Sequence, residues 1–93
     1  MADVLIVGGG VIGCLTAYYL AKAGRRATIV EADAVGSGAS GTSGGWLTPY
    51  SHTVDPAMLV LSPKSLQLHR ELSETLPEET GIDHGFEETT YLR

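Results

Sequence analysis

Two short apolar runs, with a helical pattern between them, open the chain. The runs cover residues 4–7 and 27–30, and both are rich in β-branched side chains. Runs without polar alternation are typical of strands buried on both faces of a parallel sheet. Residues 11–23 carry apolar side chains at three- and four-residue spacings, and Gly24 follows, as helix C-termini prefer. The pattern therefore predicts a βαβ unit over residues 3–31, and with it an α/β fold.

A run of small residues separates this unit from the rest of the chain. Residues 33–46 consist largely of glycine, serine, alanine and threonine, and they end in the only tryptophan. A flexible linker is the simplest interpretation of such a composition. Because the run directly follows a predicted buried strand, we favour a second interpretation, an ordered loop over residues 33–47 that contacts a ligand.

The remainder of the chain predicts a helix and a final strand. The pair Ser62-Pro63 supplies an N-cap residue and a first-turn proline, within a helical segment assigned to residues 56–80 in which leucines repeat every four residues. Pro77 predicts a kink or an end of this helix, and Gly81 predicts its stop. Residues 86–93 are rich in β-forming side chains and are predicted as a strand.

The composition narrows the possible functions. With 93 residues, of which 43% are hydrophobic, the chain holds at most one small globular domain. The net charge is −5 and no basic stripe occurs, which argues against nucleic-acid binding. No apolar run approaches the roughly 20 residues of a membrane helix. A single cysteine, Cys14, excludes an internal disulfide, and no ligand set has zinc spacing, so we expect no metal site. The start of the chain lacks a signal-peptide pattern, which predicts a cytoplasmic protein.

A phosphate-binding motif lies between the first predicted strand and the first predicted helix. Its spacing is Gly8-x-Gly10-x-x-Gly13, in the context that gives this motif physical meaning. The first glycine permits a tight turn, the second lets the backbone approach a pyrophosphate, and the third lets the helix pack closely on the strand. Glu31 follows about 20 residues later at the tip of the second strand, where a carboxylate binds a ribose diol. The sequence thus predicts a dinucleotide site that disfavours the 2′-phosphate of NADP.

Together these segments resemble the N-terminal part of the D-amino-acid oxidase superfamily of FAD-dependent oxidoreductases. The resemblance rests on residues 8–13, on residues 17–20, on Glu31 and on the glycine-rich loop of residues 36–47, and it continues over residues 72–86. The likeness is greatest to the branch of glycine oxidase and the sarcosine and dimethylglycine oxidoreductases. A second glycine loop at this distance from the acidic residue distinguishes these flavoenzymes from ordinary NAD dehydrogenases.

The resemblance also implies which residues contact the cofactor. The implied FAD contacts are Glu31 at the ribose, Ala32 beside the adenine, Val11, Ile12, Ala39 and Ser40 at the pyrophosphate, and Gly44, Gly45 and Trp46 along the isoalloxazine ring. Some members bind FAD covalently through a histidine early in the second loop. Thr42 stands at that position here, which implies noncovalent FAD. Thr90 stands where the family usually has a glycine before a strand of the substrate domain.

The implied function is the FAD-binding portion of an amino-acid or amine oxidoreductase, in which a hydride passes from a substrate C–H bond to the flavin. Members of the family are several times longer, so this Rossmann-like domain would be incomplete without the remainder of the flavoenzyme, supplied as a second chain or fragment. The arginine that the family uses for the substrate carboxylate has no motif-matched counterpart here, and the catalytic residues stay unassigned. Two alternatives remain open: a noncatalytic dinucleotide-binding assembly subunit, and a fragment of an NAD-dependent dehydrogenase.

Overall fold

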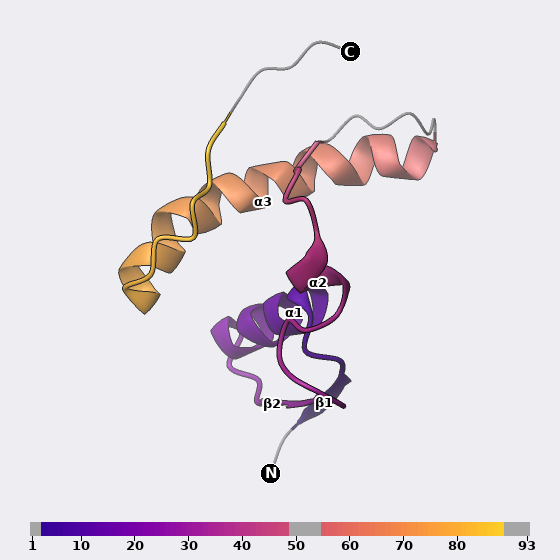
Figure 1. The fold of residues 1–93 in the computed structure, drawn as a ribbon, viewed down its shortest axis with the longest axis vertical. Coiled ribbons are helices and arrows are strands. Elements are labelled where there is room, and N and C mark those ends of the chain that lie inside the picture. Colours follow the sequence, from indigo (N-terminus) through magenta and orange to yellow (C-terminus); the bar gives the residue numbers. More distant parts are fainter. Residues whose placement is uncertain (1–2, 49–54, 89–93) are drawn as a thin grey trace. The chain divides into compact units, whose positions relative to one another are not determined.

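The structure, a computed structural model, describes residues 3–48 and 55–88. The chain forms two compact units, residues 1–46 and residues 47–93. Within the described residues, the first unit contains two strands and two helices, and the second is built on one long helix (Figure 1).

A parallel βαβ unit opens the chain, as the apolar pattern predicts. β1 covers Val4–Val7, α1 covers Val11–Lys22, and β2 covers Ala27–Val30. The strands pair in parallel with Ile6 opposite Ile29, and α1 packs on this two-stranded sheet (Figure 1). This connection brings the start of α1 to the same edge of the sheet as the end of both strands.

The two faces of the sheet differ in exposure. Alternate residues of both strands are partly buried, and Ile6 among them lies beneath Gly13 of α1. The intervening residues are exposed, Leu5 by 65% and Val7 by 85%. The prediction that both faces are buried is therefore wrong for the described chain. The apolar runs supply side chains to both faces, whereas α1 covers one.

The run of small residues contains a short helix. α2 covers Ala39–Thr42, with Gly38 as its N-cap. The N–H of Gly36 donates a hydrogen bond to the carbonyl oxygen of Gly9 at 2.9 Å. This run is therefore attached to the βαβ unit and does not extend away from it as a linker would.

A single long helix, α3, covers Pro56–Thr80. The prediction that Ser62 caps it is wrong, because Asp55 is the N-cap and its carboxylate accepts a hydrogen bond from the N–H of Ala57 at 2.9 Å. Asp55 and the proline after it form a second cap–proline pair upstream, so Pro63 lies inside the helix. Pro77 does not end the helix either. The helix stops at Gly81, whose φ of +72° is left-handed, as the sequence predicts.

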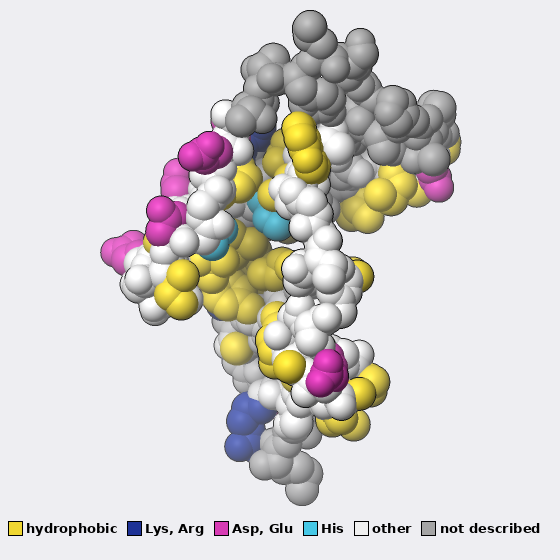
Figure 2. All heavy atoms as spheres, in the orientation of Figure 1, with side chains coloured by type: hydrophobic (Ala, Val, Ile, Leu, Met, Phe, Trp, Pro, Cys, Tyr) yellow, Lys and Arg dark blue, Asp and Glu magenta, His cyan; other side chains and the backbone are white. Residues whose placement is uncertain are grey.

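The segment after α3 runs back beside the helix, and an ion pair joins Glu88 to Arg70 (Figure 1). Figure 2 shows acidic side chains gathered over the C-terminal part of α3 and over this segment. Residues 86–88 have no regular secondary structure. The rest of the predicted strand over residues 86–93, including Thr90, lies outside the described residues. Among the helices of the described part, none combines the length and the apolar character that a membrane span requires.

Candidate functional site

The turn between β1 and α1 requires glycine at two positions. Gly8 has a φ of +113°, which residues with a side chain rarely adopt. A Cβ at Gly13 would lie 2.0 Å from the carbonyl oxygen of Gly8. The first turn of α1 therefore approaches the end of β1 more closely than any other residue type at Gly13 would permit. The thiol of Cys14 donates a hydrogen bond to the carbonyl oxygen of Gly9, in the turn, at 3.6 Å.

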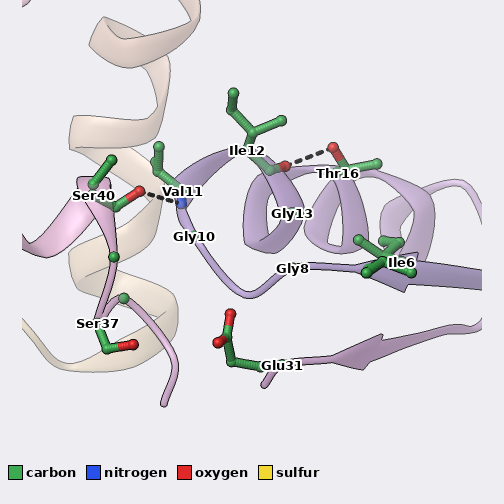
Figure 3. Close-up of a pocket in the computed structure, with 14 residues that line it drawn as sticks. Ile6, Gly8, Gly10, Val11, Ile12, Gly13, Thr16, Glu31, Ser37 and Ser40 are labelled. Atoms are coloured by element: carbon green, nitrogen blue, oxygen red, sulfur yellow. Dashed lines mark hydrogen bonds between the residues drawn. The ribbon is translucent and has the colours of Figure 1, made fainter. Parts of the chain in front are cut away.

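Glu31 comes directly after β2, and its carboxylate points toward the glycine turn (Figure 3). Its Oε1 accepts a hydrogen bond from the N–H of Gly9 at 2.8 Å, and its Oε2 accepts one from the N–H of Asp33 at 3.0 Å. These N–H groups, Gly9 first, favour the charged carboxylate and lower the pKa of Glu31 below its ordinary value. Because a carboxylate accepts about four hydrogen bonds, Glu31 keeps acceptor capacity for ligand hydroxyl groups.

The second glycine-rich loop lies against the start of α1. The Oγ of Ser40 accepts a hydrogen bond at 2.8 Å from the N–H of Val11, the first residue of that helix (Figure 3). The N-cap residue, Gly10, has no side chain and makes no capping hydrogen bond. Ser40 therefore satisfies one of the N–H groups that the first turn of a helix leaves without a partner inside the helix, although it comes from a distant part of the sequence.

A cavity of about 460 Å³ lies between the glycine turn and the second loop. The start of α1 forms one side of it, and a helix N-terminus attracts phosphate through its N–H groups and its dipole. Glu31 adds a carboxylate suited to ribose hydroxyls. A Cβ at Gly10 would lie 3.0 Å from the Oγ of Ser40, so glycine at this position lets the Ser40 hydroxyl approach the start of α1 closely. The donors and acceptors present fit a ligand that joins phosphate to ribose, as the dinucleotide part of FAD does.

Most of the predicted cofactor contacts come together at this cavity. The predicted residues on its wall are Gly8, Gly10, Val11, Ile12, Gly13, Glu31, Ala39 and Ser40. The other predicted contacts are not on its wall, and all of them are exposed: Ala32, Gly44, Gly45 and Trp46. The adenine contact of Ala32 and the ring contacts of the other three stay predictions.

The wall also contains Gly36, Ser37 and Gly38, which belong to the loop predicted to contact a ligand but were not named as individual contacts. The sequence pattern did not single out three others, Ile6, Val7 and Thr16. Gly9, which is buried, was missed as well, although it bonds both Glu31 and Gly36. One signal for the second loop was available, since Gly36-x-Gly38-x-x-Gly41 repeats the spacing of the first motif.

Comparison with known proteins relates the chain to flavoenzymes. The family model described as FAD dependent oxidoreductase matches residues 3–93. Glycine oxidase of Geobacillus kaustophilus is 45% identical over 92 residues, which are 98% of this chain and 24% of that protein. Glycine oxidase of Pseudomonas aeruginosa is 43% identical over 86% of this chain and 22% of its own length.

A solved structure agrees with the fold. The crystal structure of glycine oxidase from Bacillus cereus matches with a TM-score of 0.84 and 36% identity, over 94% of this chain and 24% of that one. This match confirms the predicted fold class, the βαβ start of a Rossmann-like FAD-binding region. The chain spans 22–24% of the length of these three proteins.

Proposed function

This chain belongs to the FAD dependent oxidoreductase family, and we propose on that premise that it supplies the first part of the FAD site of an amino-acid or amine oxidoreductase similar to glycine oxidase. One observation carries the proposal: two glycine-rich loops, joined through Gly9 and Ser40, line one open cavity beside the start of α1. A nicotinamide site of the ordinary kind needs the first loop alone.

In this proposal the residues of the cavity hold the dinucleotide part of FAD. The ribose of the adenosine binds to the free acceptor positions of Glu31, with Ala32 beside the adenine. The pyrophosphate lies at Val11 and Ile12, with Ala39 and Ser40 on its other side. From there the chain of Gly44, Gly45 and Trp46 passes the isoalloxazine ring.

Bound FAD would supply the acceptor for a hydride from an amino-acid or amine C–H bond, and the protein would supply position and electrostatics. Noncovalent attachment is favoured by the position of Thr42. Its hydroxyl donates to the carbonyl oxygens of Gly38 and Ala39, both at 3.3 Å, and so is engaged within its own helical turn. A small amino-acid or amine substrate, and the residues that act on it, belong to the remainder of the flavoenzyme.

The exposed face of the two-stranded sheet supports the proposal that this chain needs the remainder of the flavoenzyme. Leu5, Val7 and Val30 are all at least half exposed on β1 and β2. Parallel sheets occur with both faces covered and with more than two strands. Since the related glycine oxidases are about four times as long as this chain, we infer that further strands and helices of the same enzyme cover this face, within one polypeptide or as a second chain.

The function is tested by identifying the cofactor that copurifies with the assembled protein. Flavin absorbance in the visible range and the mass of FAD, released on denaturation, are expected. A bound nicotinamide cofactor would favour the NAD-dehydrogenase alternative instead. FAD together with undiminished turnover after substitutions in residues 36–47 would favour the noncatalytic assembly subunit.

A substitution at Glu31 tests the ribose contact. In the assembled enzyme, Glu31→Gln is expected to weaken FAD binding by about 10-fold or more, because the amide keeps the shape but loses the charge and one acceptor oxygen. The dissociation constant is measured by titrating the flavin-free enzyme with FAD. Asp33→Asn is the matched control, since it makes the same change two residues away. Equal affinity in Glu31→Gln and the parent enzyme would remove Glu31 from the ribose site.

The lowered pKa of Glu31 predicts a particular pH dependence. Protonation removes the charged acceptor, so its contribution to FAD affinity is present above the pKa of the folded protein and is lost as the pH falls through it. The ratio of FAD affinities between the parent enzyme and Glu31→Gln should therefore fall at acid pH, and the midpoint of this fall should lie below 4.5, the ordinary pKa of glutamic acid. A ratio that already shrinks between pH 7 and pH 5.5 would contradict a lowered pKa.

A further inference from the structure

The second glycine-rich loop repeats the backbone geometry of the first. Each begins with a glycine of positive φ, +113° at Gly8 and +74° at Gly36. Each places a glycine at the N-cap of a helix, Gly10 for α1 and Gly38 for α2. In each, the last glycine of the motif packs onto the carbonyl oxygen of the first. The ideal Cβ would lie 2.0 Å from that oxygen at Gly13 and, in the second loop, 2.1 Å from it at Gly41.

The residue before Gly41 makes one of the contacts that join the two loops. Ser40 precedes Gly41 in α2, and its Oγ accepts the hydrogen bond from the N–H of Val11 at 2.8 Å. At the other end of the loop, Gly36 donates to the carbonyl oxygen of Gly9 at 2.9 Å. The two turns are thus held together at two points, at Gly36 and at Ser40, and Gly41 comes directly after the second of them in the chain.

We propose that Gly41 is a positioning residue, which places the hydroxyl of Ser40 on the first N–H of α1 and so completes the wall of the cavity. Any side chain at Gly41 must move the Gly36 carbonyl or the turn of α2, because the atom it meets is backbone and cannot rotate aside. Either shift separates Ser40 from Val11. The expected effect of Gly41 on FAD binding rests on the proposed function. The hydrogen bond between Ser40 and Val11, in contrast, is present in the protein without a ligand.

The glycines of this loop are not equivalent, which argues against a general need for flexibility. A Cβ at Gly38 meets nothing within 4 Å, and Gly38 has a φ of −88°, which any residue adopts. The same glycine-to-alanine change can therefore be tested at Gly38 and at Gly41. Only at Gly41 would the added Cβ meet a backbone atom. The pair forms an internal control that the structure itself supplies.

The first measurement is hydrogen exchange of the Val11 amide in the assembled, flavin-free enzyme. Gly41→Ala is expected to accelerate this exchange by about 10-fold, the equivalent of one hydrogen bond. Ser40→Ala should do the same, whereas Gly38→Ala should leave it within about twofold of the parent. The proposal is overturned if Gly41→Ala and Gly38→Ala exchange alike. It is also overturned if Ser40→Ala leaves the Val11 amide protected, an outcome that can still be measured should Gly41→Ala fail to fold.

The second measurement is FAD affinity in a double-mutant cycle of Gly41→Ala and Ser40→Ala. If Gly41 acts by placing Ser40, the two losses overlap, and the double variant binds FAD about as weakly as the weaker of the two single variants. Losses that simply multiply would show that Gly41 has a separate structural role and would overturn the proposal. An enzyme that binds no FAD at all would contradict the proposed function instead, and the exchange measurement would still decide the role of Gly41.

Discussion

Chain 1–93 by itself is expected to unfold without a cooperative thermal transition. Among the described residues, Leu72 alone is a buried hydrophobic, at 5% exposure. The two-stranded sheet leaves Leu5 and Val7 exposed, and a two-stranded sheet is marginal in water without further cover. Too little apolar surface is removed from water to offset the loss of chain entropy, which costs about 1–2 kcal/mol per residue for the backbone alone.

Circular dichroism recorded against temperature measures this directly. The isolated chain should lose its helical signal gradually, whereas the same residues assembled with the remainder of the flavoenzyme should melt in one sigmoidal step that FAD shifts upward. A sharp transition of the isolated chain without FAD, in the 45–65 °C range of mesophile domains, would contradict the expectation. Such a result would mean that the two units stabilise themselves without the missing cover.

The second large effect concerns the path of the flavin ring. In the assembled enzyme, Gly44→Val is expected to remove or displace the flavin and to lower turnover strongly. Within this chain a Cβ at Gly44 meets only the Cδ1 atom of Trp46, at 3.5 Å, an ordinary contact. The described residues therefore leave room for a Cβ atom at Gly44, and a loss of flavin would indicate a ring that lies against the backbone there.

The choice of Gly44 avoids a complication at its neighbour. Gly45 has a φ of +79°, so any side chain at that position strains the backbone whether or not FAD is near. Ala34→Val is a suitable control, because Ala34 is exposed, lies in the same segment and is not on the cavity wall. Flavin content and the visible spectrum are measured for each variant. If the loop is a solvent-exposed linker, both substitutions change stability by only a few tenths of a kcal/mol, and full flavin occupancy in Gly44→Val would place the ring elsewhere.

The sequence determined the parts of this protein that depend on neighbours in the chain. The order of strand, helix and strand follows from apolar periodicity, and the ends at Gly24 and Gly81 follow from the left-handed conformation that glycine adopts readily. The phosphate turn could be predicted because its three glycines and Glu31 have a fixed spacing. Local signals failed where two of them compete. Asp55 and Ser62 each precede a proline, and propensity alone does not choose between two such starts of one helix.

Tertiary structure decided which groups meet across the chain. Glu31 binds the N–H of Gly9 across 22 positions of sequence, and Ser40 binds that of Val11 across 29. A backbone N–H is present at nearly every residue, so no side-chain pattern identifies which one a carboxylate or hydroxyl will reach. Likewise, Gly41 resembles the other glycines of its loop in sequence, and only the position of the Gly36 carbonyl shows that it excludes a side chain. Such contacts arise when the parallel strands bring their ends, and the loops that follow them, to one edge of the sheet.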